Sequence, residues 1–566
     1  MSTTQQLANR EQTSSFASIH RLEALIMAAL ILLGFGLRAW QLENAGLDHF
    51  DEGVYVFSAL GLTDSTQPHQ LYPQQERFSP PVYLGLLSLS YLLNGGPADT
   101  AAIFVNILLG TISIGLIWWI GRSWFNSTVG IVAATLLTFS EYHIELSRTA
   151  LTDITFSLFF LIALAVIVAA LRRQSFGWAM LAGLAVGIAW NSKYHGMFAL
   201  IATGGALLPY SWLQYRQGKP IRRNFLLFGV MGVVAVACYL PWALYIQSQP
   251  GGYAGLAAYQ RTLLSLAWPA NFWRYIQFQA YYIGPLSRFS VPLAFFLAAI
   301  VSHRKIQLNS RFWALSGLLA LVALGLGSVG TAVILTLIAI PILLRQRDLF
   351  ASWLLLAWLG LWLVMTPLYQ PYARLILPFV MAAYLAAGLV LAAAVNYLSD
   401  PQEESNWRPI GALAGVTTVT LLIAFLLPSQ IEPWRPERNQ AETAAAVQEI
   451  VPPGSRIIVL GEPTLAYYLH LAGYRAFERT EDMAVIESLE TPVYLMTGTY
   501  ADRAPSLRQG LKRLEDRLTL LGAFPMEPGD VRLLDDTPPQ KATAYRTAPD
   551  DTYTLTLYYL SPQTEE

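Results

Sequence analysis

An acidic cluster near the start of the chain holds residue types suited to acid–base chemistry. Asp48, His49, Asp51 and Glu52 lie within five positions, and Tyr55 follows shortly after. A carboxylate can accept the proton of an acceptor hydroxyl, and aspartate and histidine can together bind a divalent cation. The cluster is therefore a candidate chemical centre, with Asp48 and His49 as candidate metal ligands. The alternative is a solvated loop with no chemical role.

A second polar segment ends in two charged residues at the start of an apolar stretch. Arg148 and Asp153 flank that start, at the level where a lipid phosphate would lie in a membrane. The alternatives are an arginine that reaches along the lipid surface to water and an aspartate that favours the positive end of a helix. Glu141, His143 and Glu145 could contribute a metal ligand, but we favour a solvated loop for these three.

Two further cations stand beside apolar segments. Lys193 lies in a polar break, with His195 two positions later, and Arg374 opens a later apolar stretch. Both fall on the side of the membrane whose loops are poorer in basic residues. Binding an anionic phosphate would explain these positions, and snorkelling to lipid headgroups is the alternative. We favour phosphate contact for both.

The composition places these residues in a membrane protein. Of the 566 residues, 54% are hydrophobic and only 13% are charged, whereas a soluble protein carries about 25% charged residues. So little charge cannot cover a water-exposed globule of this length. A net charge of −1 gives no reason to expect nucleic acid as a partner. The single cysteine, Cys238, excludes an intrachain disulfide and a thiolate metal cluster.

Hydrophobic runs predict an all-α polytopic membrane domain over residues 1–428. A helix needs roughly 20 apolar residues to cross the hydrocarbon core of a bilayer. By this criterion we predict about thirteen spans, the first of which is retained as a helix because no cleavage pattern follows it. They lie near 22–40, 100–120, 128–142, 153–171, 177–191, 196–214, 224–246, 286–302, 312–328, 330–344, 349–366, 374–397 and 409–428.

The loop charges predict the orientation of the chain. One set of predicted loops holds about twice as many Lys and Arg residues as the other. Because positive residues favour the cytoplasmic side, we place the N-terminus in the cytoplasm of a plasma (inner) membrane, and an odd span count puts the C-terminus outside. Two outer loops are long, at about 41–99 and 247–285. The second has apolar residues at helical spacing, which predicts an amphipathic helix along the membrane surface.

The composition changes after Pro428, where charged residues and Pro-Pro turns become frequent. Residues 429–566 are predicted to form a small extracytoplasmic α/β domain, with a strand at 456–461, a helix at 465–473 and a second strand at 493–497. The segment has no Gly-x-Gly-x-x-Gly or Walker sequence, so it shows no sign of a nucleotide site. We expect a structural role for it, as a lid or docking surface.

The order of these motifs carries a family resemblance. An Asp-Glu pair with a following x-x-Tyr precedes a Pro-Pro pair, an Arg-x-x-x-x-Asp segment, a lysine between two spans and a late Arg-x-x-x-Pro. The residues are Asp51, Glu52, Tyr55, Pro80, Pro81, Arg148, Asp153, Lys193, Arg374 and Pro378. Over about residues 20–400 the chain resembles the GT-C fold glycosyltransferases of the protein O-mannosyltransferase and aminoarabinose transferase type. Each motif is short, and their shared order on one membrane face makes the combination specific.

The resemblance implies a transferase that moves a sugar from a polyprenyl-phosphate carrier to an acceptor on the outer side, with inversion. Asp51 matches the family's catalytic acidic residue, Glu52 lies beside it, and Asp153 matches the acid of the second loop. Asp51 would then act as general base on the acceptor hydroxyl or amine. The implied partners are a polyprenyl-phosphate sugar donor, a glycan, lipid or protein acceptor, and membrane lipids.

The remaining expected roles concern the donor. Lys193, Arg148 and Arg374 are expected to bind its phosphate, and Tyr55 and His195 are candidate contacts to donor or acceptor. No cofactor is required by this scheme, although a divalent cation is a candidate.

One residue departs from the family pattern. Relatives of the aminoarabinose transferase type carry a lysine where this chain has Ser79, so phosphate binding would fall on Arg77 or on the other cations. A polytopic transporter or lipid flippase is the alternative function, and a scaffold that binds partners through its outer domain is a third. Ionisable residues near mid-membrane and a two-half repeat, which are typical of transporters, are not prominent in the sequence.

Overall fold

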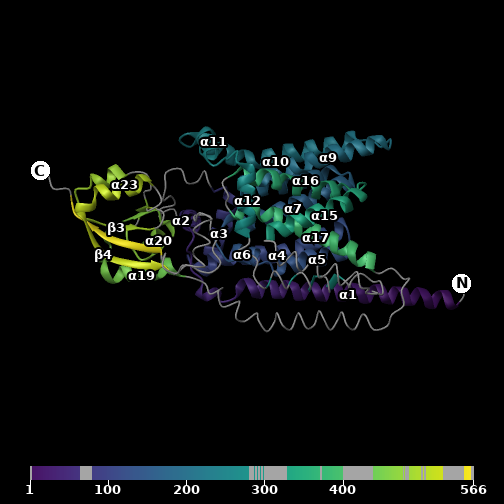
Figure 1. Ribbon diagram of the computed structural model, residues 1–566, viewed down its shortest axis with the longest axis horizontal. Coiled ribbons are helices and arrows are strands. Elements are labelled where there is room, and N and C mark those ends of the chain that lie inside the picture. The colour runs from purple at the N-terminus through teal and green to yellow at the C-terminus, as the bar shows by residue number, and fades with distance from the viewer. Residues whose placement is uncertain are drawn as a thin grey trace.

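The computed structural model describes residues 3–63, 79–279, 328–369, 373–398, 438–475, 477–478, 483–498, 501, 505–526 and 553–562, with six single positions between 286 and 298. A helical bundle forms the larger part of the molecule, and an α/β unit lies at one end of its long axis (Figure 1). The N-terminal end of the first helix lies at the opposite end (Figure 1).

The described part of the bundle is built from helices that run mostly along the long axis. In chain order they are α1 (Thr3–Ala39), α2 (Phe50–Thr63), α3 (Pro81–Asn94), α4 (Asp99–Trp124), α5 (Ser127–Thr138), α6 (Glu141–Ser147), α7 (Thr152–Arg173), α8 (Phe176–Ser192), α9 (Phe198–Arg216), α10 (Arg222–Ser248), α11 (Gly252–Thr262), α12 (Trp268–Gln279), α15 (Ser328–Arg345), α16 (Phe350–Met365) and α17 (Leu377–Leu398). Among the described residues, seven helical segments are long and apolar enough to cross a membrane, and four shorter apolar helices accompany them.

The observed helices agree with most of the predicted spans. Seven of the thirteen have a membrane-length counterpart, and those near 128–142, 177–191 and 330–344 correspond to shorter apolar helices. The other three lie outside the described residues apart from isolated positions: 286–302, 312–328 and 409–428.

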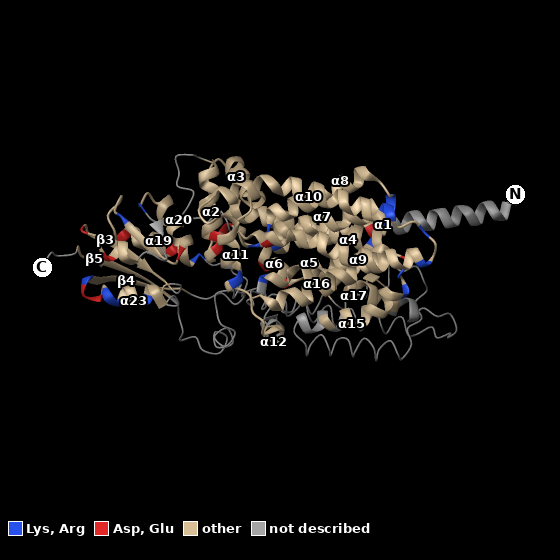
Figure 2. Ribbon diagram, turned by 90° about the horizontal axis from the view of Figure 1, so that it is seen from above, with Lys and Arg blue, Asp and Glu red and all other residues tan. Residues whose placement is uncertain are grey.

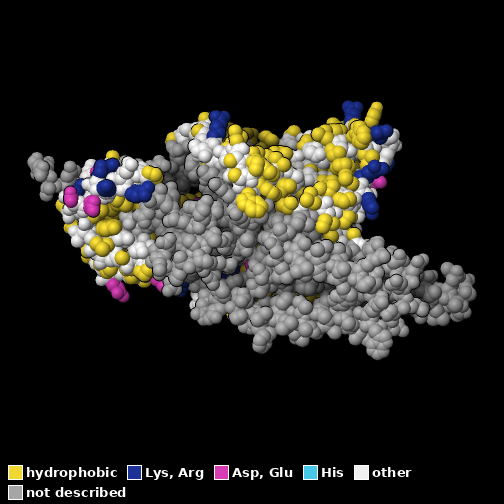
Figure 3. Space-filling model, viewed as in Figure 1, with side chains coloured by type: hydrophobic (Ala, Val, Ile, Leu, Met, Phe, Trp, Pro, Cys, Tyr) yellow, Lys and Arg dark blue, Asp and Glu magenta, His cyan; other side chains and the backbone are white. Residues whose placement is uncertain are grey.

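The outside of the bundle is apolar. On α9 and α10, Trp212 is 60% exposed, Val233 71% and Leu244 62%. Figure 3 shows hydrophobic side chains spread over the part of the bundle that these two helices form. So much contiguous apolar surface is suited to lipid rather than to water. The chain is therefore a multi-pass membrane protein.

The segment predicted as a long outer loop at about 41–99 contains two helices in its described residues, α2 and α3, each 14 residues long. Helix α3 begins with Pro81 and ends before Gly95, whose φ of 79° favours glycine. Both helices are shorter than the roughly 20 residues that a span requires, so a search for spans passes over them.

The segment predicted as a solvated loop around Glu141 is instead the buried helix α6. Ser140 caps this helix by accepting the N–H of His143 at 3.3 Å, and Glu141 and His143 are 4% and 0% exposed. Nη2 of Arg38 donates to Nδ1 of His143 at 2.9 Å and to the carbonyl of Leu137 at 3.1 Å. Arg38 is itself fully buried in α1, so its guanidinium joins α1, α5 and α6.

In its described residues, 247–279, the long segment predicted at 247–285 contains two helices, α11 and α12. Helix α12 is held against the end of α16, because Trp268 Nε1 donates to the carbonyl of Val364 at 3.0 Å. Asn271 Nδ2 likewise donates to the carbonyl of Pro367 at 2.9 Å. The expectation that this segment lies along a membrane surface stays a prediction.

The C-terminal unit is a mixed five-stranded sheet with helices. Its described elements are α19 (Asn439–Ile450), β1 (Ile457–Leu460), α20 (Pro463–Leu471), β2 (Phe477–Glu478), α21 (Met483–Glu487), β3 (Val493–Thr497), α23 (Pro505–Arg513), β4 (Leu518–Met526) and β5 (Tyr553–Leu560). The strand order is β2-β1-β3-β5-β4, with β1 parallel to β2 and β3, and β5 antiparallel to β3 and β4. The predicted strands β1 and β3 and the helix α20 are confirmed. Strands β2, β4 and β5 were missed by the sequence analysis.

Candidate active site

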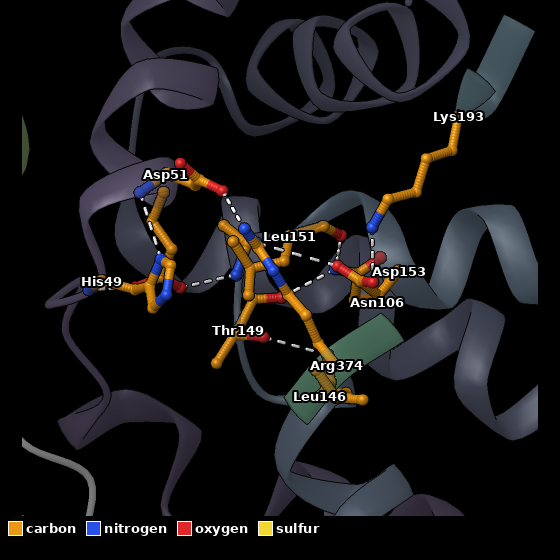
Figure 4. A network of polar contacts seen from close by, with 11 residues as sticks. His49, Asp51, Asn106, Leu146, Thr149, Leu151, Asp153, Lys193 and Arg374 are labelled. Carbon is orange, nitrogen blue, oxygen red and sulfur yellow. Dashed lines mark hydrogen bonds and ion pairs between the residues drawn. The ribbon is translucent and has the colours of Figure 1, made fainter. Parts of the chain in front are cut away.

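Four charged side chains from separate segments of the chain lie close together in one polar network (Figure 4). Asp51 and Asp153 lie in the first turns of α2 and α7, Lys193 directly follows α8, and Arg374 lies in the 3-10 helix η6 (Ala373–Ile376) before α17. Arg374 Nη2 pairs with Asp51 Oδ2, and its Nη1 is 3.9 Å from Asp153 Oδ2. Lys193 Nζ donates to Asp153 Oδ1 at 2.7 Å. The structure therefore brings together four of the predicted site residues.

The backbone around Lys193 places its side chain in this network. Lys193 has extended dihedral angles (φ −159°, ψ 143°), which end α8, and its carbonyl accepts the N–H of Gly196 at 2.8 Å. A Cβ on Gly196 would lie 2.2 Å from the backbone carbon of Ala189, so only glycine lets the chain fold back onto α8. This tight turn after α8 fixes the backbone position from which the Lys193 side chain extends.

The four side chains differ in accessibility. The side chain of Asp51 is 28% exposed, whereas those of Asp153, Arg374 and Lys193 are 3%, 13% and 17% exposed. A general base must contact the hydroxyl or amine that it deprotonates. Of the two carboxylates in the network, Asp51 is the one that a substrate can reach.

The surroundings of Asp51 keep its carboxyl group ionised. Burial alone would raise the pKa of Asp51, but the nearby charges of Arg374, His49 and Lys193 and the hydrogen bond from Arg374 together lower it below its ordinary value. Asp51 is thus available to accept a proton at neutral pH, although the pairing with Arg374 weakens it as a base.

Glu52, which we predicted to be catalytic, contacts backbone groups. Its Oε2 accepts the N–H of Asp48 at 3.0 Å and of His49 at 2.9 Å, and its Oε1 accepts the N–H of Ala150 at 2.6 Å. The bond back to His49, three residues earlier, is the glutamate half of a capping box. Burial raises the pKa of Glu52. Through Ala150 the side chain joins the segment that bears Asp51 to the one that leads to Asp153, and a catalytic role stays a prediction.

The candidate metal ligands Asp48 and His49 have protein partners. Nδ1 of His49 accepts the N–H of Asp51 at 3.1 Å, as a residue that caps a helix does. Oδ1 of Asp48 accepts the N–H of Gln440 in α19 at 3.0 Å. The described residues contain no group of three or more His, Cys, Asp and Glu side chains suited to a metal ion.

Arg148 is bound to the end of the first helix. Its Nη1 donates to the carbonyl of Trp40 at 2.7 Å and to that of Arg38 at 3.2 Å. These bonds give Arg148 a structural role, and its contact with a donor phosphate stays a prediction. Ser79 is buried, and Arg77 lies outside the described residues.

The two candidate substrate contacts lie among aromatic rings. Tyr55 is 8% exposed and its ring lies 5.6 Å from that of Tyr83, edge to face. Burial raises the pKa of the Tyr55 hydroxyl, so this group stays protonated. The His195 ring lies 5.5 Å from Phe198 and 6.0 Å from Trp362. Their roles as substrate contacts stay predictions.

Asn106 in α4 is a part of the site that sequence reasoning missed. It is fully buried, and its Nδ2 donates to the carbonyls of Thr149 at 2.7 Å and Leu151 at 2.6 Å (Figure 4). Its Oδ1 accepts from Thr155 Oγ1 at 3.3 Å. These bonds shape the turn before Asp153. The sequence feature that could have identified Asn106 is a polar amide inside an apolar span, because a polar side chain in a membrane needs hydrogen-bond partners.

Part of the sequence matches a family of known transferases. Residues 79–245 match the family described as dolichyl-phosphate-mannose-protein mannosyltransferase. No curated protein sequence matches the chain.

Two groups of solved structures have a similar fold. One is ArnT from Cupriavidus metallidurans bound to undecaprenyl phosphate, with 15% identity, a TM-score of 0.51, and coverage of 95% of this chain and 99% of that one. The other is the oligosaccharyltransferase AglB from Archaeoglobus fulgidus in complex with an inhibitory peptide and a dolichol-phosphate. Its identity is 13% and its TM-score 0.54, with coverage of 90% of this chain and 74% of that one. The chain has the GT-C fold.

Proposed function

We propose that this protein is a membrane glycosyltransferase that moves a sugar from a polyprenyl-phosphate-linked donor to an acceptor, with inversion. The observation that carries the proposal is the accessible carboxylate of Asp51 beside Arg374, with Asp153 and Lys193 completing the cluster. The family match over residues 79–245 and the GT-C fold support it.

The proposed reaction is a displacement at the anomeric carbon. Asp51 takes the proton of the acceptor hydroxyl or amine, and the acceptor atom attacks the face opposite the phosphate. The bond between the anomeric carbon and the phosphate oxygen breaks, and polyprenyl phosphate leaves with the electron pair. Lys193 and Arg374 stabilise the departing phosphate, because fixed charges act strongly in a partly dry site. Acceptors of three classes fit this chemistry: a glycan, a lipid and a protein.

Arg374 has a second role in this scheme. A donor phosphate that approaches Lys193 competes with Asp51 for the guanidinium of Arg374. When Arg374 turns to the phosphate, the charge that lowers the pKa of Asp51 weakens, and burial raises that pKa. Donor binding therefore strengthens the base, so proton abstraction follows the arrival of the donor.

An apolar groove offers room for the start of the prenyl chain. Its volume is about 410 Å³, and it lies between α3, α8 and α10, reaching Asn191, which is two residues before Lys193. Other lining residues are Pro81, Val82, Ile188, Cys238 and Trp242. A phosphate at Lys193 and a chain in this groove are compatible with one lipid-linked donor.

The proposed orientation puts the site on the outer side of a plasma (inner) membrane. Figure 2 shows Lys and Arg at the end of the bundle opposite the α/β unit, where α1 joins the bundle. Arg122, Arg173 and Arg216 lie in the last turns of α4, α7 and α9, and Arg122 Nε is 3.4 Å from Glu23 Oε1 in α1. Because basic ends favour the cytoplasm, the N-terminus is cytoplasmic and the α/β unit extracytoplasmic. The clustering of charge at one end also favours the transferase over the transporter or flippase alternative.

The proposal is tested with purified protein and a radiolabelled polyprenyl-phospho-sugar, in the presence of an extract of cell-envelope acceptors. We expect label to pass to an acceptor and free polyprenyl phosphate to appear in equal amount. Asp51→Asn should lower the rate by roughly 10²–10⁴-fold, the usual worth of general-base catalysis. The matched control is Asp516→Asn, an exposed aspartate in the α/β unit. Movement of intact labelled donor across the bilayer, without release of polyprenyl phosphate, would contradict the transferase and support a flippase.

A further inference from the structure

The α/β unit touches the segment that carries Asp51. Oδ1 of Asp48 accepts the N–H of Gln440 at 3.0 Å, and its Oδ2 accepts from Asn439 Nδ2 at 3.4 Å. Both partners lie in the first turn of α19. A carboxylate at a helix N-terminus satisfies an otherwise unpaired N–H and complements the helix dipole. The residue three positions before Asp51 thus caps a helix of the other unit.

A second contact joins α2 directly to α20. Thr464 Oγ1 donates to the carbonyl of His49 at 2.8 Å. A Cβ on Gly53 would lie 2.2 Å from the backbone nitrogen of Thr464 and 2.4 Å from the carbonyl carbon of Pro463. These are backbone atoms, so no side-chain rotation could make room for it. The turn that carries Asp51 therefore packs directly against the backbone of the α/β unit.

A third contact comes from a tyrosine of α20. The hydroxyl of Tyr468 accepts the N–H of Leu47 at 2.9 Å and donates to Asp99 Oδ2 at 2.8 Å. The neighbouring Tyr467 hydroxyl lies 3.3 Å from that of Tyr91 in α3. Helix α20 therefore binds the segment before α2 and two helices of the bundle at the same time.

We propose that the α/β unit is a positioning part of the active site, which holds the segment 47–53 so that Asp51 meets the acceptor. Asp48, Thr464 and Tyr468 are positioning residues in this account, since they contact the backbone or helix ends around Asp51 and not the reacting atoms. The inference rests on the proposed role of Asp51 as base. Displacement of a reacting group by about 1 Å can lower a rate by roughly 10²-fold, so the unit affects turnover without contacting substrate.

The first test compares two glycine substitutions. Gly53→Ala adds a Cβ against the backbone of Thr464, whereas Gly85→Ala in α3 adds a Cβ with nothing within 4 Å. We expect Gly53→Ala to lower kcat on the order of 10²-fold with an unchanged KM for the donor, and Gly85→Ala to behave as wild type. A general folding defect would instead lower the amount of inserted, donor-binding protein. A wild-type kcat in Gly53→Ala would overturn the proposal.

A second pair of variants keeps the test decisive if Gly53→Ala fails to fold. Asp48→Ala removes the acceptor for the Gln440 N–H, and a lost cap should lower kcat roughly 10-fold. Asp48→Asn keeps an amide oxygen in that place, so it should restore most of kcat. Equal loss in both variants, reversed by added Mg²⁺ or Mn²⁺, would show Asp48 to be a metal ligand and overturn the positioning role.

The outcomes separate this inference from the proposed function. If Asp51→Asn is inactive while Gly53→Ala and Asp48→Ala are fully active, the positioning proposal is wrong and the base assignment stands. If Asp51→Asn is fully active, Asp51 is not the base. The proposal that the α/β unit positions Asp51 for catalysis is then wrong as well.

Discussion

Arg374 and Asp51, 323 positions apart in the sequence, form an ion pair in the candidate active site. Arg374 also approaches Asp153, which in turn accepts a hydrogen bond from Lys193. Two carboxylates and two cations thus alternate, which lets each buried charge face an opposite one. In this order Arg374 lies next to the accessible carboxylate of Asp51, and Lys193 lies next to the buried carboxylate of Asp153.

The ion pair predicts a change in pH dependence when Arg374 is replaced. The pKa of Asp51 lies below its ordinary value, so the carboxylate is ionised above that pKa and activity is lost only as the pH falls through it. In Arg374→Gln the charge and the hydrogen bond of Arg374, which both lower the pKa of Asp51, are lost. The pKa of Asp51 therefore rises, and the acid limb of kcat/KM moves to higher pH. The position of the limb is read separately from the overall loss of activity. An unmoved limb in this variant would show that another group controls it.

Lys193 is predicted to act mainly on donor binding. Hydrogen bonds to charged groups contribute about 1.5–3 kcal/mol, so Lys193→Met should lower kcat/KM for the donor by roughly 10–100-fold. This variant also leaves Asp153, 3% exposed, without its ammonium partner. The double variant Lys193→Met with Asp153→Asn should therefore regain thermal stability but not donor affinity. Recovery of donor affinity in the double variant would argue that Lys193 is only a structural partner of Asp153.

Glu52 is predicted to contribute to stability through the three backbone N–H groups that it accepts. Removal of a buried acceptor costs about 1–3 kcal/mol, so Glu52→Ala should lower the melting temperature measured in detergent. Glu43→Ala, in the short 3-10 helix Leu42–Asn44 before α2, serves as the control. If Glu52→Ala abolishes turnover while the melting temperature stays that of the wild type, the catalytic prediction is favoured instead.

Chelation is predicted to leave transfer intact. Asp48 is bonded to Gln440 and His49 to Asp51, and the described residues contain no cluster suited to a metal. We expect full activity after exhaustive dialysis against EDTA, measured by release of polyprenyl phosphate. Loss of activity that Mg²⁺ or Mn²⁺ restores would support a cation at Asp48 and His49.

The sequence was most informative where a property is local. Hydropathy identifies a span because each membrane helix meets the length requirement by itself, and α4, α7 and α10 were placed in this way. Strand β1 and helix α20 were recognised from runs of a few residues. Helices α2 and α3 were missed because 14-residue helices fall below the length of a span. Strands β4 and β5 depend on pairing between distant segments, which no local pattern records.

By itself the sequence determined the membrane class, the acidic cluster and the candidate cations, because residue type, spacing and hydropathy can be read directly from the order of residues. Only the tertiary structure decided which of these residues meet. In the folded protein Arg374 pairs with Asp51, and Arg148 donates to the carbonyls of Arg38 and Trp40 at the end of α1. Glu52 accepts hydrogen bonds from backbone N–H groups. The physical reason is that a charge buried beside a membrane needs a partner at hydrogen-bond distance, and that partner comes from whichever distant segment the packing brings near.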